Sequence, residues 1–130
     1  MTNHATGPFE VKLTPDAESK DPRRMLIDKT FHGEIEAVSK GQMLAVMTET
    51  KGSAGYVAME VVNGTLAGHK GTFALQHSGT MDRGAQSLTI TVVPDSGTGE
   101  LTGLQGTMKI RIEEGGKHFY DFDYQLPGVI

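Results

Sequence analysis

The feature of this sequence that most constrains its fold is the alternation of apolar and polar residues with a period of two. Phe9, Val11 and Leu13 fall on one face of their segment, and polar residues fall on the other. Segments 106–113 and 117–125 alternate in the same way. This period is typical of half-buried β-strands and does not fit an amphipathic helix. The chain is therefore predicted to be mostly β-structure.

Turn-forming residues divide the alternating segments into about eight strands. The first strand ends at Pro15, and the polar residues 16–22 are predicted to form an exposed loop. A second, longer strand begins near Met25, bends at Gly33 and ends at a turn formed by Lys40-Gly41. The remaining strands are predicted at residues 42–50, 55–62, 71–81, 86–93, 106–113 and 117–125.

A glycine-rich pattern, G-x-L-x-G-x-x-G-T, occurs at residues 64–72 and again at residues 99–107. Each copy leads into a predicted strand. We interpret it as a recurrent hairpin connection in which the leucine lies under a glycine-rich loop. The alternative is chance similarity, since 17 of the 130 residues are glycine.

Antiparallel strands with one apolar face must close into a barrel or pair as two sheets, because a flat sheet would leave that face in water. We predict closure, which gives an all-β fold with a single closed antiparallel barrel over residues 1–130. Residues 1–7 are expected to form a flexible tail. A barrel of about eight strands is either filled by its own side chains or holds one small ligand.

Composition excludes several classes of function. The 12 basic and 16 acidic residues give a net charge of −4 without a basic patch, so nucleic acid is not an expected partner. No apolar run approaches the roughly 18 residues of a membrane helix, and the N-terminus does not resemble a signal peptide. The absence of cysteine removes disulfides and thiol chemistry. We expect a cytoplasmic protein.

Three motif-like arrangements are interpreted as structural. Asp95-Ser96-Gly97 matches the D-[ST]-G motif of aspartic proteases, but Pro94 precedes it and these residue types are ordinary turn formers. The glycines of segment 97–103 do not have dinucleotide-binding spacing. The histidines never occur at H-x-H spacing, so we expect neither a metal nor a cofactor, with histidines converging from separate strands as the alternative.

Four strings carry a resemblance to a known family: FHGEIEA at residues 31–37, GTFALQHSGTM at 71–81, PDSGTGEL at 94–101 and HFY at 118–120. They resemble a bacterial family of unknown function whose members are similar in fold to allene oxide cyclase. The likeness extends over residues 5–126. It implies a small, oligomeric antiparallel barrel without a known reaction, whose plant relatives by fold hold an oxidised fatty acid.

His77 is the first candidate for a functional residue, because it shares a strand face with Phe73, Leu75 and Met81. An imidazole facing a cavity acts as a general base or as a donor to a ligand. The favoured alternative is a core histidine that is hydrogen-bonded by a neighbouring backbone group or tyrosine.

Further candidate ligand contacts combine apolar area with a polar tip or supply apolar wall. The polar contacts are Tyr56, His118, Tyr120 and Tyr124, and the wall is formed by Phe73, Met81 and Phe122. The alternative is that the tyrosines are simply part of the barrel interior.

Two charged residues have ambiguous orientations. Lys29 falls on the inward face by parity and would pair there with Glu49 or Glu60, but we favour a head group that reaches water. Glu60 would be a general acid with a raised pKa if it pointed inward. We favour the opposite register, with Val57, Met59 and Val61 inside and Glu60 in solvent.

The sequence therefore predicts an uncharacterised barrel that binds a small apolar or oxygenated organic ligand and forms a homo-oligomer. The first alternative is an isomerase or cyclase that acts on a lipid-like substrate, with His77 or Glu60 moving a proton. The second is a non-catalytic structural or interaction module with a filled barrel.

Overall fold

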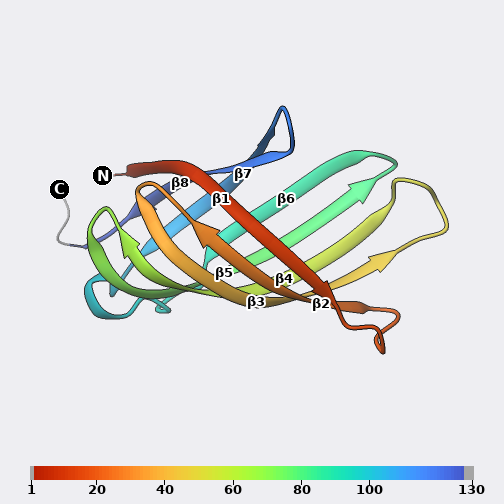
Figure 1. Cartoon of the computed structure of the whole chain (residues 1–130), viewed down its shortest axis with the longest axis horizontal. Coiled ribbons are helices and arrows are strands. Elements are labelled where there is room, and N and C mark those ends of the chain that lie inside the picture. The colour runs from red at the N-terminus through yellow and green to blue at the C-terminus, as the bar shows by residue number, and fades with distance from the viewer. Residues whose placement is uncertain (1, 128–130) are drawn as a thin grey trace.

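The computed structural model describes residues 2–127 as a closed barrel of eight antiparallel strands (Figure 1). Neighbours in sequence pair along the whole barrel, and β8 pairs with β1 to close it. The predicted fold class is confirmed. The elements are β1 (Asn3–Pro15), β2 (Arg23–Phe31), β3 (Ile35–Met47), β4 (Ala54–Leu66), β5 (His69–Asp82), β6 (Ala85–Val92), the short 3₁₀ helix η1 (Gly99–Leu101), β7 (Gln105–Glu113) and β8 (Lys117–Gln125).

The turn predicted at Lys40-Gly41 is wrong, because β3 runs straight through these residues. The chain turns at residues 32–34 instead, where Gly33 adopts a φ of 97° that favours glycine. The hydroxyl of Tyr120 stabilises this turn, accepting a hydrogen bond from the amide of Ile35 at 2.9 Å and donating one to the carbonyl of His32 at 2.7 Å. Gly41 has a different role: a Cβ atom there would lie 2.7 Å from Cα of Glu60.

The two copies of the glycine-rich pattern have different structures. Residues 64–72 form the β4–β5 hairpin, whereas residues 99–107 contain η1 and the start of β7, so the hairpin interpretation holds for the first copy alone. Leu66 and Leu101 are both buried, as predicted. The segments also contact each other, since the amide of Lys70 donates a hydrogen bond to the carboxylate of Glu100 at 2.8 Å.

The Asp95-Ser96-Gly97 segment is a turn, as predicted. Asp95 is exposed and has a φ of 62°. The hydroxyl oxygen of Ser96 accepts a hydrogen bond from the amide of Ala74 at 3.0 Å. The connection between β6 and β7 is thereby attached to β5.

The barrel has two dissimilar ends. The filled end, at the left of Figure 1, carries the β2–β3 and β4–β5 turns, and η1 packs there against β5. Buried side chains occupy its interior, among them Tyr120, Phe122 and Leu101. The open end, at the right of Figure 1, carries the β1–β2 loop and the β3–β4 and β5–β6 turns.

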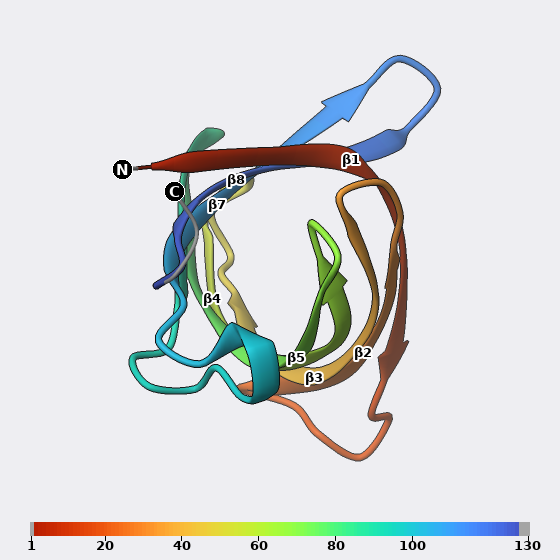
Figure 2. The same cartoon turned by 90° about the vertical axis from the view of Figure 1, so that its left-hand side faces the viewer.

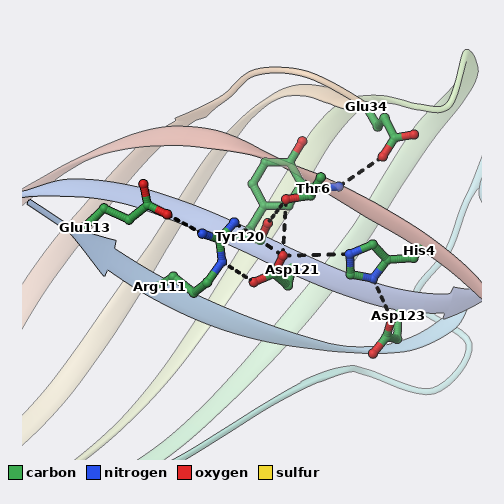
Figure 3. Close-up of polar contacts among 8 residues, drawn as sticks. All are labelled: His4, Thr6, Glu34, Arg111, Glu113, Tyr120, Asp121 and Asp123. Carbon is green, nitrogen blue, oxygen red and sulfur yellow. Dashed lines mark hydrogen bonds and ion pairs between the residues drawn. The ribbon is translucent and has the colours of Figure 1, made fainter.

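An exposed polar network joins the strands that close the barrel (Figure 3). Nδ1 of His4 in β1 lies 2.7 Å from the carboxylate of Asp123 in β8. The hydroxyl of Thr6 donates to Asp121 at 3.2 Å, and Nε of Arg111 donates to the same carboxylate at 2.6 Å. Residues 3–7, expected as a flexible tail, are thus the first residues of β1 and pair with β8. Residue 1 lies outside the described part.

This network predicts a pH-dependent contribution of His4 to stability. The hydrogen bond to Asp123 raises the pKa of His4 above 6.5. The contribution is therefore fully present below the unfolded-state pKa and is lost as the pH rises through the folded-state pKa. We expect His4→Gln to lower the urea midpoint at about pH 5.5 and to have little effect at about pH 9. An equal loss at both pH values, or the same pH dependence for the control His69→Gln, would contradict this role.

Candidate functional site

The open end contains a cavity of about 890 Å³. Residues of β2 to β6 and of the β1–β2 loop line it. Its wall is largely apolar, and its mouth carries Lys20, Asp21 and Arg23. The main apolar lining residues are Met25, Met43, Met47, Tyr56, Met81 and Leu88. Four of these are methionines, whose flexible side chains adapt to ligands of different shape.

A buried polar cluster lies deeper in the barrel than Tyr56. Glu60 accepts hydrogen bonds from Nζ of Lys29 at 2.7 Å and from the hydroxyl of Ser39 at 2.6 Å. Nε2 of His77 lies 2.6 Å from the same carboxylate. We call Lys29, Ser39, Glu60 and His77 the Glu60 cluster. The four side chains come from β2, β3, β4 and β5, so the cluster links neighbouring strands across the barrel interior.

The orientation favoured for Glu60 is wrong. Glu60 is 1% exposed, whereas Val57, Met59 and Val61 point outward and are at least half exposed. Counting apolar residues along β4 alone favours the opposite register. The observed register is stable because three donors surround the inward carboxylate, and because Ala58, on the same inward face, is also buried.

The orientation favoured for Lys29 is also wrong, and the alternative of a pair with Glu60 holds. The side chain of Lys29 is 6% exposed. Its ammonium lies 5.4 Å from the ring centre of Phe9 and 5.8 Å from that of Phe31. Glu60 and these aromatic faces together offset the cost of burying the charge.

The Glu60 side chain is ionised at neutral pH. Burial alone raises its pKa, but the hydrogen bond from His77, the charge of Lys29 and the hydrogen bonds from Lys29 and Ser39 outweigh burial and lower the pKa to about 2. The raised pKa expected for an inward Glu60 is therefore wrong. A carboxylate of this kind orients His77 and Lys29 and has no proton to donate as a general acid.

Two of the candidate residues line the cavity, and the buried His77 and Glu60 are not among them. Tyr56 and Met81 do so, and the Tyr56 ring centre lies 6.5 Å from that of His77. Gly79, the register partner of Tyr56, provides space for this ring, because a Cβ atom there would lie 2.5 Å from Cε1 of Tyr56. Burial, followed by the charge of Glu60, raises the pKa of the Tyr56 hydroxyl.

The remaining candidates do not line the cavity. Phe122 stacks between Phe73 and Tyr124, with ring centres 6.0 and 5.3 Å apart, and belongs with them to the buried core. Tyr120 is buried there as well and supports the β2–β3 turn. His118 packs edge-on against Phe9 at 5.4 Å. The inward face was correctly predicted for these residues, but most of them fill the barrel.

Sequence reasoning missed Met25, Met43 and Met47 as lining residues. The alternation of residues along each strand could have identified them, because every second residue shares one face. Met25 and Met43 are register partners on β2 and β3, and both fall on the inward face that also holds Ile27.

Within residues 2–127, no three histidine or acidic residues gather at metal-binding distance. The same part of the chain contains no helix long and apolar enough to cross a membrane.

Comparison with known proteins identifies the family. Residues 5–124 match the model of a family described as protein of unknown function, DUF3224. This chain belongs to that family. The crystal structure of a DUF3224 protein of unknown function from Shewanella oneidensis MR-1 is 50% identical, with a TM-score of 0.93, and the alignment covers 99% of this chain and 100% of the other. A comparison with curated proteins gives no match.

The Glu60 cluster predicts strong energetic coupling between Lys29 and Glu60. Glu60→Gln leaves the Lys29 charge buried without a counter-ion, so we expect the free energy of unfolding to fall by about 3–5 kcal/mol. In the double variant Lys29→Met/Glu60→Gln, the loss should be smaller than the sum of the single losses by at least about 1 kcal/mol. Urea denaturation of the four proteins measures this coupling.

The matched control is the ion pair of Lys40 and Asp28 on the outer surface of β3 and β2, with 3.4 Å between Nζ and Oδ1. Both side chains are at least half exposed. Asp28→Asn should therefore cost less than about 1 kcal/mol. Additive losses for Lys29 and Glu60, or losses as small as that of Asp28→Asn, would contradict the account.

Proposed function

We propose that this DUF3224 protein binds one small, largely apolar organic molecule in the cavity at the open end. The observation that carries the proposal is the cavity itself, whose volume of about 890 Å³ falls within the range of pockets for small organic ligands. Displacement of water from its apolar wall by a ligand lowers the free energy of the system. A barrel filled throughout by its own side chains, one of the predicted alternatives, does not account for this space.

The inner part of the cavity favours a ligand with an oxygen function. Within residues 2–127, the hydroxyl of Tyr56 makes no hydrogen bond, unlike that of Tyr120. A hydroxyl on an apolar wall donates to a carbonyl or ether oxygen at little cost in desolvation. Because Lys29 balances the charge of Glu60, the region beyond Tyr56 is polar without a net charge when His77 is neutral. An oxygenated apolar molecule therefore fits better than a hydrocarbon.

An isomerase or cyclase is the second candidate. It is favoured by the contact between His77 and the ionised Glu60, because a carboxylate that holds one imidazole nitrogen orients the ring for proton transfer. An enzyme should lose turnover in His77→Ala while remaining folded. The fold analogy with allene oxide cyclase and the cytoplasmic location remain predictions.

Filling the cavity tests the proposal. Ala45 faces the cavity from β3. Thr89, next to the lining residue Leu88, is exposed on the outer face of β6. We expect Ala45→Trp to weaken binding of the neutral fluorescent probe N-phenylnaphthylamine by at least about tenfold, since the indole occupies the ligand volume. Thr89→Trp is the matched control and should bind as the wild type does. Failure of the wild type to bind, or equal binding by both variants, would contradict the proposal.

We also propose that the protein is a homo-oligomer, as predicted from the sequence. The support is an apolar outer face on β3 and β4, where Leu44 and Val57 are register partners and both are over 40% exposed. Val46, Met59 and Val61 extend this face. The ion pair of Lys40 and Asp28 borders this face beside Val61. An apolar face is complementary to itself, so a second copy of the chain is the partner that fits.

A charge placed in this face should prevent assembly. Val57→Glu is expected to convert the oligomer to a monomer in native mass spectrometry, because burying an unpaired carboxylate opposes association. Gln125→Glu, at an exposed position of β8 away from this face, is the control and should not change the mass. A monomeric wild type would contradict the proposal.

A further inference from the structure

The barrel wall is split between β6 and β7. These strands share only two register pairs, Ile90 with Met108 and Thr91 with Thr107, whereas β7 and β8 pair from Gln105–Gln125 to Glu113–Lys117. From residue 109 onward, β7 therefore has no register partner in β6, while it remains paired with β8. β8 itself stays paired with β1 as far as His118. Figure 2 shows the turn end of the β7–β8 hairpin projecting away from the rest of the barrel.

The split leaves apolar side chains of the inward face in solvent. Ile90 and Met108, at the last inward pair, are 1% and 3% exposed. Leu88, the next inward residue of β6, is 44% exposed. On β7, Ile110 still packs against the core, and Ile112 is 67% exposed. The exposure of Leu88 and Ile112 follows from the position of the hairpin, because alternation places both on the face that is buried elsewhere in the barrel.

The split also borders the cavity. The lining residues come from β2 to β6 and the β1–β2 loop, and they include Gln86 and Leu88 of β6. Neither β7 nor β8 contributes to the lining. On the side of β7 the cavity is therefore open, because β7 does not form a wall there.

The two separated strand edges match in register. Continuing the ladder from Ile90 and Met108 sets Leu88 opposite Ile110 and Gln86 opposite Ile112. All these positions face inward, and the backbone edges of β6 and β7 would pair without a shift. Unpaired edges of this kind are a site of strand addition, and the edge of the same chain is present at the highest effective concentration.

We propose that the β7–β8 hairpin is a flap that closes the cavity by extending the β6–β7 ladder. The inference rests on the proposed function for its purpose, because closure converts the open cavity into an enclosed site around a ligand. The closing movement itself is inferred only from the unpaired edges of β6 and β7. The base of the flap is fixed, because Tyr120 is buried and β8 stays paired with β1 as far as His118. Closure therefore bends the outer part of the hairpin toward β6. Closure buries Leu88 and Ile112 and hydrogen-bonds the free edges.

Disulfide trapping tests the flap, and the absence of natural cysteine makes the experiment clean. In Gln86→Cys/Ile112→Cys the two thiols meet when the ladder is extended. In the control Ser87→Cys/Ile112→Cys the first thiol lies on the outer face, so extension of the ladder keeps the thiols apart. Glu113→Cys/Lys117→Cys, a register pair of the hairpin, confirms that oxidation proceeds. Circular dichroism of the reduced proteins shows that each variant is folded.

We expect the first pair to form an intramolecular disulfide at least about tenfold faster than the control pair, measured by mass spectrometry. Equal rates, or no cross-link under conditions that oxidise the register pair, overturn the flap. Disulfide-linked dimers also overturn it, because they show that the edges recruit a second copy. N-phenylnaphthylamine separates the two proposals: a cross-link without probe binding retains the flap and rejects the ligand, and probe binding without a cross-link does the reverse.

Discussion

The structure depends on one buried carboxylate and the three side chains that donate to it. Glu60 lies at the centre of an interior where an unpaired charge would be strongly unfavourable, and Lys29, Ser39 and His77 reach it from three other strands. A slip of one residue in β4 would move Glu60 to the outer face and leave the Lys29 ammonium in the core without a counter-ion. The Glu60 cluster therefore selects one register for the strands that also line the cavity.

The Glu60 cluster lies between two parts of the barrel interior that are filled differently. Toward the filled end, stacked aromatic rings and the leucines of the two glycine-rich segments occupy the interior. Toward the open end, methionine, alanine and glycine make up much of the lining beside Tyr56 and Leu88, and they leave space. The same alternating pattern thus produces a packed core and a cavity, and the size of the inward residues decides which one forms.

The period of two was sufficient to predict the fold class, the number of strands and the inward face of the candidate residues on β5 and β8. It was not sufficient to separate the role of Gly33, which permits a turn, from that of Gly41, which permits the close approach of Glu60. The orientation of Glu60 was missed because its stabilising partners lie on other strands. The division of the aromatic residues between core and cavity depends on how the barrel closes, which local patterns do not show.

The central claim is that the space between the Glu60 cluster and the open end holds one organic molecule. Native mass spectrometry of gently purified protein, followed by extraction and identification of any bound compound, tests it most directly. The account predicts one oxygenated, largely apolar molecule per chain. A protein of bare sequence mass that is not stabilised by any member of a diverse panel of apolar and oxygenated compounds would contradict it.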